Sequence, residues 1–457
     1  MASSSHSPSR RRWLKASLAG AGVLGGAGFF LRHRLRERLS SWTRLASFSA
    51  PPNPAPHDPA RDRVTLHVGR GGGPAANVDS ALGKLGGLAT IVGERDIVVV
   101  KVSAQWWNQG MTNVLGTKRV VEHVLERPGF KGEVIVLENT HFRLASGSGL
   151  SRAFTYPSER NVDVPGMRCL GDLERWFAER RAPVSFVGLV DAGPSALAGD
   201  AWRDPGHEHG TYGGDERGPL AAGDDRDGYH WDLDGGFRLR RSWVDDACSP
   251  LTWPRFTSPL TGAVVDFRDG IHRREQGRLV PTGQPLRYLC LTTANEHTST
   301  GYTGCCKAAM GLVDMSAGRL GTDPRVRDLQ SVHFFGEPDA PWRMAGPLAH
   351  FAAKVRAPDL YITLAEWVGL TPSGPFDDAL DIRLEAASAI RTDTVVAGTD
   401  PVAMDAWVVR NLLMPQGGRK RALYDLDEPA SLASCFLAYY RETLGRGTLD
   451  PNLIAVT

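Results

Sequence analysis

Two stretches, Asp96-Ile97-Val98-Val99-Val100-Lys101 and Glu133-Val134-Ile135-Val136-Leu137-Glu138, decide the fold. Each holds a run of four aliphatic residues with no alternating polar position. Such runs are typical of strands that are buried on both faces, as in a parallel sheet covered by helices on both sides. The two stretches therefore predict an α/β fold with a mainly parallel sheet flanked by helices.

The sequence around these two strands alternates between strand and helix patterns at short spacing, which is typical of α/β proteins. We expect further strands at residues 64–68, 184–190, 286–293, 359–364 and 394–397, and helices at 77–85, 114–126, 171–181, 401–413 and 431–444. The pattern predicts one large α/β domain over residues 63–457.

A glycine-rich loop, Gly69-Arg70-Gly71-Gly72-Gly73-Pro74, follows the first expected strand. A dinucleotide-binding loop would need its third glycine where Pro74 stands, and no expected strand ends in the acidic residue that contacts a ribose. We interpret the loop as a tight turn before a helix that Asn77 caps and that Gly86 and Gly87 end.

Residues 195–285 differ from the rest, because they are rich in Gly, Asp, Arg and Trp and show little periodicity. They predict an irregular, loop-rich insertion of short strands and long loops. The insertion contains His207-Glu208-His209, in which two histidines share one face of an extended chain and could bind a metal ion. A solvated loop is the alternative interpretation.

The first residues carry an address signal. The segment Ser9-Arg10-Arg11-Arg12-Trp13-Leu14-Lys15 resembles the twin-arginine consensus, and the uncharged, glycine-rich stretch Ala16 to Leu31 follows it. We expect residues 1–49 to be a twin-arginine signal that the twin-arginine translocase reads, and residues 50–62 to be a proline-rich linker. Because arginines follow Leu31 directly, an uncleaved membrane anchor is the alternative interpretation of this segment. The predicted location is periplasmic or otherwise extracytoplasmic.

Charge excludes one class of partner. The chain has 53 basic and 51 acidic residues, but residues 1–49 hold nine basic residues and one acidic residue. The remainder has 44 basic and 50 acidic residues, a net charge of −6. We therefore expect no nucleic-acid partner and a small-molecule ligand instead.

The six cysteines form no C-x-x-C pair, so the sequence has no iron–sulfur cluster motif and no zinc-ribbon motif. One or two disulfides are compatible with an oxidising periplasm, and the sequence does not pair them. We expect Cys435 to be a buried core thiol. The adjacent Cys305 and Cys306 leave a redox-active pair open.

Open α/β sheets bind ligands at the carboxyl ends of their strands. In this sequence that rule selects the residues at or just after expected strands, namely Lys101, Glu138, Asn139, Asp191, His297 and Asp400. A lysine, a histidine and several carboxylates suffice for acid–base chemistry or for binding a hard metal ion.

Four stretches together resemble the bacterial family called domain of unknown function 362. They are Asp96–Lys101 with Thr112-Asn113, Gly132–Asn139, His297 through Thr303 and Lys307 to Gly311, and Ala397–Asp405. Of these, Gly398-Thr399-Asp400-Pro401 with Asp405 is the most specific. The chain departs from the family at Val102-Ser103 and Ala308, has Glu366 where members often show Asp, and lacks the cluster-binding cysteine repeats of some members.

The candidate site follows from the strand ends and the resemblance together. We expect His297, Lys307, Lys101, Asp405 and Glu138 to be catalytic. Four further residues are expected to bind the ligand, namely Thr112, Asn113, Thr303 and Asp400. A divalent metal ion is compatible with this set as a cofactor.

Two of these residues have structural alternatives. Asp400 precedes Pro401 and is also a good helix cap. Asp405 lies among apolar helix residues and needs a partner or a ligand. We expect Lys101, His297, Lys307 and Asp405 to converge on one cleft.

The function expected from these residues is that of an exported enzyme acting on a small anionic substrate by acid–base or metal-assisted chemistry. A non-catalytic periplasmic protein that binds a ligand or assists assembly is the alternative.

The leader gives the first testable prediction. Replacing Arg10 and Arg11 with lysine should leave the protein in the cytoplasm, because the translocase reads the arginine pair. Cell fractionation measures this, with Arg32→Lys/Arg34→Lys as the matched control. Unchanged periplasmic delivery of the first variant contradicts the prediction.

Overall fold

The computed structural model describes residues 63–104, 107–139, 152–155, 157–189, 220, 223–239, 247–297, 300–314, 332, 344–369, 389–416 and 421–457. All of them belong to one compact unit, Asp58–Thr457. The predicted leader, the linker to residue 62 and the His207–His209 motif lie outside the described residues. Within the described part of the chain, no helix is both long and apolar enough to cross a bilayer.

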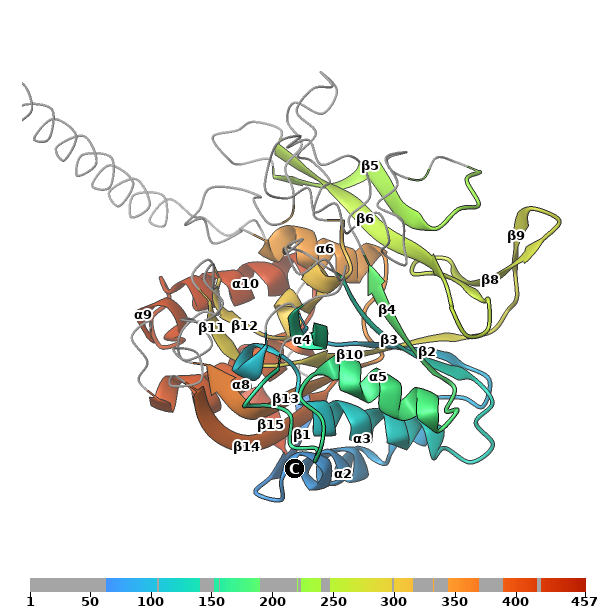
Figure 1. Cartoon of the computed structure of the whole chain (residues 1–457). Coiled ribbons are helices and arrows are strands. Elements are labelled where there is room, and N and C mark those ends of the chain that lie inside the picture. Colours follow the sequence, from blue (N-terminus) through green and yellow to red (C-terminus); the bar gives the residue numbers. More distant parts are fainter. Residues whose placement is uncertain are drawn as a thin grey trace, which may run out of the picture. The chain divides into compact units, whose positions relative to one another are not determined.

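A large, mostly parallel sheet forms the centre (Figure 1). Its strand order is β15 (Ile454–Val456), β1 (Val64–Arg70), β14 (Ala389–Gly398), β13 (Leu360–Gly369), β10 (Leu286–Thr292), β2 (Ile97–Lys101), β3 (Glu133–Asn139) and β4 (Val184–Leu189). Neighbouring strands pair in parallel except at β14, which runs antiparallel to both β1 and β13. A short hairpin of β11 (Asn295–His297) and β12 (Gly301–Thr303) joins β13 at Gly369.

Helices cover both faces of this sheet. Three helices, α2 (Pro74–Leu85), α3 (Val114–Leu125) and α5 (Leu170–Glu179), bury their apolar residues against one face. The other face packs against η5 (Cys305–Gly311), α6 (Ala345–Lys354), α8 (Pro401–Val408) and α10 (Leu432–Leu444). Both faces of β2 and β3 are thus buried, which explains their uninterrupted aliphatic runs.

The other described helices and helical turns are short. They are α4 (Arg152–Thr155), α9 (Arg421–Tyr424), the 3-10 turns η2 (Leu88–Thr90), η3 (Asn108–Gly110), η9 (Met414–Gln416) and η10 (Pro451–Leu453), and the π-helical turn η8 (Val409–Leu413) that extends α8.

The predicted strands and helices of the α/β pattern are confirmed to within a few residues, but the predicted helix cap is wrong. Helix α2 begins at Pro74, three residues before Asn77. Gly73 makes this early start possible, because its φ of 79° is favourable only for glycine. The Asn77 side chain instead accepts a hydrogen bond from Gly72 N and donates one to Asp393 O, which ties the glycine loop to β14.

The insertion is more regular than predicted. Its described part forms an antiparallel sheet of β5 (Gly228–Leu239), β6 (Ala247–Thr257), β7 (Val264–Asp266), β8 (Gly270–Glu275) and β9 (Arg278–Pro281). The prediction of irregular structure is therefore wrong for residues 228–281. Tyr229, Trp253 and Phe256 of this sheet join the same hydrophobic core as α6 and α10, so side-chain burial organises a stretch without clear sequence periodicity.

Glu133 links the two sheets. Its buried carboxylate accepts hydrogen bonds from Ser185 on β4 and from Ser258 and Thr261, which follow β6. A buried carboxylate is tolerated when hydroxyl donors satisfy it. These bonds hold the antiparallel sheet against the amino-terminal end of β3.

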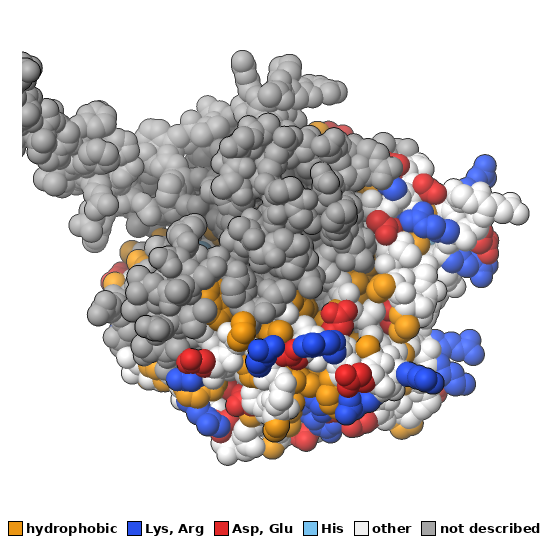
Figure 2. Space-filling view, in the orientation of Figure 1, with side chains coloured by type: hydrophobic (Ala, Val, Ile, Leu, Met, Phe, Trp, Pro, Cys, Tyr) orange, Lys and Arg blue, Asp and Glu red, His pale blue; other side chains and the backbone are white. Residues whose placement is uncertain are grey.

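The helical face shown in Figure 2 carries interspersed charges. Arg119 on α3, for example, lies between Asp79 and Glu126, at 2.6 and 2.8 Å. On the described part of that face, no broad patch of a single sign is visible.

Candidate functional site

Lys101 and Glu138 form a buried ion pair at the carboxyl ends of neighbouring strands β2 and β3. The Lys101 Nζ atom lies 3.0 Å from Oε2 of Glu138, and the two side chains are 4% and 3% exposed. Both residues are candidates that the sequence selected. This edge is where open α/β sheets bind ligands.

The surroundings of the pair shift the pKa of the Glu138 carboxyl close to neutral pH. Burial raises the pKa of Glu138 to about 7, although the charge and hydrogen bond of Lys101 act in the opposite direction. Desolvation penalises the carboxylate more than the neighbouring ammonium group stabilises it. Near neutral pH, Glu138 is therefore protonated part of the time.

The strand register places Lys101 in a row with two other reactive side chains. Lys101 pairs with Cys290 on β10, and Cys290 pairs with Tyr361 on β13. Residues level with one another on parallel strands project to the same face of the sheet. Burial raises the pKa of the Cys290 thiol to about 11, so this cysteine is a protonated thiol between the lysine and the tyrosine.

The 3-10 helix η5 covers the ion pair at its carboxyl end. A Cβ atom on Gly311 would lie 2.3 Å from Cε of Lys101 and 2.6 Å from Oε2 of Glu138. Any larger residue at 311 would therefore force the ion pair to shift. The Nδ2 group of Asn139 donates hydrogen bonds to the carbonyl oxygens of Met310 and Val313, at 3.0 and 2.9 Å, and so fixes this end of η5.

Asp405 fixes the other end of η5. Its carboxylate accepts hydrogen bonds from the backbone amides of Cys305 and Cys306, at 2.7 and 2.8 Å, and from the Tyr302 hydroxyl, at 2.7 Å. Burial raises the pKa of Asp405, and these hydrogen bonds oppose the shift. A Cβ atom on Gly304 would lie 2.3 Å from Oδ1 of Asp405, so a larger residue here would displace this carboxylate.

The positions of its hydrogen bonds make Asp405 a positioning residue. Its partners begin at Cys305, whereas the ion pair contacts η5 at Gly311. At about 2 Å of rise per residue, these two points on η5 lie roughly 12 Å apart. The described contacts therefore bring Lys101 to Glu138 and bring Asp405 to the start of η5.

His297 lies on β11 and Lys307 lies on η5, the helix that covers the Lys101–Glu138 pair. His297 is opposite Gly301 in the β11–β12 hairpin, and its side chain shares a face with that of Thr303. Lys307 is half-buried on η5, and its backbone amide donates to Gly304 O at 3.3 Å. Convergence of these two side chains with Lys101 and Asp405 stays a prediction.

The other ligand-binding candidates lie at the starts of helices. Asp400 caps α8 by accepting hydrogen bonds from Val402 N and Ala403 N, and it also accepts one from Thr448 N. The structure thus gives Asp400 the helix-cap role that the sequence left open.

Asn113 caps α3 by accepting a hydrogen bond from Gly116 N, and its amide group donates to Asp163 at 2.5 Å. The adjacent Thr112 is buried, and its hydroxyl has no hydrogen-bond partner among the described residues.

Sequence reasoning gave no role to Glu366, which lies in β13 where the register shifts between Ala365 and Trp367. The side chain is 1% exposed, and neither carboxylate oxygen has a hydrogen-bond partner of good geometry among the described residues. Burial, together with the charges of Asp163 and Asp393, raises its pKa to about 8. A single acid within the apolar run of residues 360–368 was the available signal.

Five cysteines whose side chains the structure describes are free thiols. They are Cys169, Cys290, Cys305, Cys306 and Cys435. Burial raises the pKa of Cys305 and of Cys306 well above the ordinary thiol value, so neither is a reactive thiolate at neutral pH. Cys435 is only partly buried. No group of three or more His, Cys, Asp or Glu side chains in the described parts of the chain is arranged to hold a metal ion.

Comparisons with known proteins add little to this geometry. No protein-family model and no curated protein matches the chain. Among solved structures, it is similar to a Thermotoga maritima protein solved as a structural-genomics target, at 13% identity and a TM-score of 0.29. The match covers 65% of this chain and spans about half, 52%, of the other protein. The resemblance to domain of unknown function 362 stays a prediction.

Glu366 gives the second testable prediction. Its raised folded-state pKa means that the wild type loses stability as the pH rises from about 4.5 through about 8. Glu366→Gln cannot ionise, so at about pH 9 it should be more stable than the wild type by on the order of 3 kcal/mol, and nearly equal at about pH 5. Urea unfolding across this pH range measures the difference.

The control for this prediction is Glu179→Gln, because the Glu179 side chain is 75% exposed. Its stability difference from the wild type should stay small at every pH. A Glu366→Gln effect that does not change with pH, or a loss of stability at alkaline pH, contradicts the prediction.

Proposed function

We propose that this protein is an enzyme that moves a proton to or from a small anionic substrate, with Glu138 as the acid–base group. The observation that carries the proposal is the buried Lys101–Glu138 pair, in which the pKa of Glu138 is raised to about 7. A general acid or base works best when its pKa lies near the working pH. Carboxyls perturbed in this way by burial and one specific partner are typical of functional sites.

Lys101 supplies the charge that an anionic substrate needs. A substrate anion that approaches its ammonium group competes with Glu138 as the counter-ion. Glu138 then loses part of the interaction that stabilises its charged form and binds a proton more readily. Binding of the anion and protonation of Glu138 are therefore coupled through the 3.0 Å contact between the two groups.

The location of the pair supports a catalytic role over a purely structural one. The pair lies at the carboxyl ends of β2 and β3, the edge at which open α/β sheets bind ligands. The ion pair itself is fixed by two buried strands and by η5, which gives the acid–base group a defined position.

The same proposal includes where the enzyme acts. The Ser9–Lys15 motif supports export by the twin-arginine route, with the domain active outside the cytoplasm. The resemblance of the Ala397–Asp405 stretch supports membership of the family called domain of unknown function 362.

The proposal predicts turnover that depends on Glu138. Purified protein is incubated in D2O with a bacterial metabolite extract, and mass spectrometry records conversion or deuterium incorporation. We expect the wild type to act on at least one small anionic compound and Glu138→Gln to slow this reaction by about 10²- to 10⁴-fold. Lys101→Met should move the half-maximal rate to higher pH, because burial of Glu138 is then unopposed.

The matched control is Glu126→Gln, an exposed glutamate on the helical face, which should leave the rate unchanged. Equal rates for the wild type and Glu138→Gln contradict the proposal. Binding of an anion without conversion by the wild type supports the non-catalytic alternative instead.

A further inference from the structure

The Lys101–Glu138 pair is almost fully covered, since its side chains are only 4% and 3% exposed. A substrate that exchanges a proton with Glu138 must come within hydrogen-bond distance of it. Among the described segments, η5 lies directly against both side chains, at Gly311. Displacement of η5 at this point therefore uncovers the pair.

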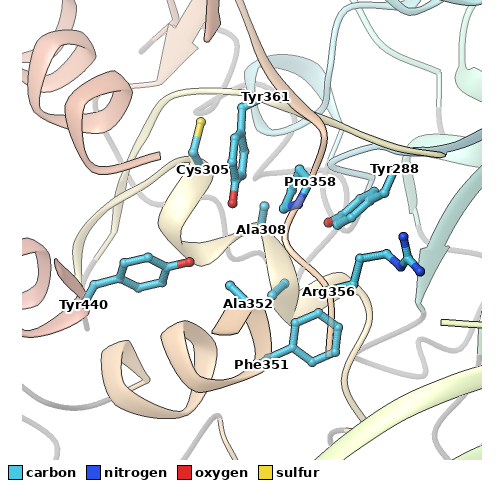
Figure 3. A pocket seen from close by; sticks show the side chains of 10 residues that line it. Tyr288, Cys305, Ala308, Phe351, Ala352, Arg356, Pro358, Tyr361 and Tyr440 are labelled. Atoms are coloured by element: carbon cyan, nitrogen blue, oxygen red, sulfur yellow. The ribbon is translucent and has the colours of Figure 1, made fainter. Parts of the chain in front are cut away.

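The helix η5 is long for its type. It has seven residues in 3-10 geometry, whereas runs of more than about four residues are uncommon because their hydrogen bonds have poor geometry. Its side chains at 308 and 309 are small, and both alanines line a small pocket beneath the middle of η5 (Figure 3). The pocket is also lined by three tyrosines, namely Tyr288, Tyr361 and Tyr440. The middle of η5 is thus easier to displace than an α-helix of the same length.

Two carboxylates anchor the segment from Cys305 to Asp314, which we call the lid. At its start, the Asp405 carboxylate accepts hydrogen bonds from the first two backbone amides of the lid. At its end, the Asp314 carboxylate accepts a hydrogen bond from Trp231 Nε1, at 2.7 Å, and the Asp314 amide donates to Thr252 Oγ1, at 2.9 Å. Hydrogen bonds to charged groups are about twice as strong as neutral ones. Both ends are therefore firmly held.

A neutral side chain holds the part of the lid between these anchors. The Nδ2 group of Asn139, the residue after Glu138 on β3, donates hydrogen bonds to the carbonyl oxygens of Met310 and Val313. These two bonds flank Gly311, which lies against the pair. They join neutral groups, so each contributes less than the charge-assisted bonds at the ends. Release of Asn139 therefore frees the part of the lid that covers the pair, while both ends stay in place.

We propose that Asn139 is the latch of this lid and is thereby a positioning residue for the proton transfer. When Asn139 is bonded to the lid, the lid lies over Lys101 and Glu138 and keeps water out. When it releases the lid, residues 307–313 move away from β2 and β3 and admit the substrate anion to Lys101. The purpose of this movement rests on the proposed acid–base function, but the movement itself is measured without turnover.

Amide hydrogen exchange of the full-length purified protein, resolved to single residues by mass spectrometry with fragmentation, tests the movement. In the wild type, the amides of residues 312 and 313, which donate to Ala309 O, should be less protected than those of residues 305 and 306, which Asp405 binds. Asn139→Ala should speed exchange at residues 312 and 313 by at least about fivefold, since two neutral hydrogen bonds are lost. Exchange at residues 305 and 306 should not change.

Asn77→Ala is the matched control. Asn77 is also a buried asparagine whose side-chain amide donates to a backbone carbonyl, that of Asp393, and it lies on α2. Exchange in residues 305–313 should be the same in this variant as in the wild type. Thermal unfolding confirms that each variant is folded, and the wild-type comparison decides the proposal if Asn139→Ala does not fold.

Labelling of Cys290 measures whether the space beside the pair opens. Cys290 is fully buried and is level with Lys101 on the neighbouring strand. Asn139→Ala should raise the rate at which N-ethylmaleimide modifies Cys290 by at least about fivefold, in proportion to the open population, and Asn77→Ala should not.

Steady-state kinetics with a substrate of Glu138 give a third readout. When only the open form binds substrate, the apparent KM varies inversely with the open population. Asn139→Ala should therefore lower KM by at least about fivefold. A merely structural role of Asn139 predicts an unchanged or higher KM instead.

Four results would overturn the proposal. They are equal protection of residues 305–306 and 312–313 in the wild type, unchanged exchange at 312–313 in folded Asn139→Ala, unchanged labelling of Cys290 in that variant, and an unchanged or higher KM. Absence of turnover by the wild type contradicts the acid–base role of Glu138, and the exchange and labelling results then decide the movement of the lid by themselves.

Discussion

Much of the surrounding structure stabilises the two buried charges of the Lys101–Glu138 ion pair. Two charged side chains that are almost fully removed from water lose most of their hydration free energy. Their attraction for each other and fixed polar groups around them offset this loss. The helix η5 provides the cover that keeps water out. Its two ends are held by different side chains, Asn139 at Met310 and Val313 and Asp405 at Cys305 and Cys306. Glycine at 304 and 311 lets these groups approach the backbone.

The balance of forces in the pair explains why it can act as a proton site. A fully effective ion pair would lower the pKa of Glu138 below that of an ordinary glutamate, and full burial without a partner would raise it much further. The structure lies between these limits, because Lys101 offsets only part of the desolvation. Glu366 shows the contrast. It is buried to a similar degree, no ion pair to it is formed by the described residues, and its pKa is higher still.

The sequence predicted the elements whose physical cause is local. The aliphatic runs of β2 and β3 required burial on both faces, and Asp400-Pro401 is a helix start by its chemistry alone. It also selected Lys101 and Glu138, because both end a predicted strand. The sequence could not predict the direction of β14 or the antiparallel sheet at 228–281, since both depend on contacts between distant segments. The same holds for the role of Asp405, whose partners lie about 100 positions away along the chain.

The pocket lined by Tyr288, Tyr361 and Tyr440 shows the same limit of sequence reasoning. Tyr288, Tyr361 and Tyr440 sit in apolar patterns that predict core positions, and they are core positions. Only the sheet register and the packing of α10 bring their hydroxyls to one space (Figure 3). No spacing or motif in the sequence indicates that these side chains meet.

The proposed acid–base role of Glu138 depends on its protonation in the folded protein. Carbon-13 NMR of glutamate side-chain carboxyl groups, compared between the wild type and Glu138→Gln, isolates the signal of this residue. The account predicts that this signal titrates with a midpoint of about 7. A midpoint at or below the ordinary glutamate value of about 4.5 would contradict it, because the pair would then be a permanent structural ion pair.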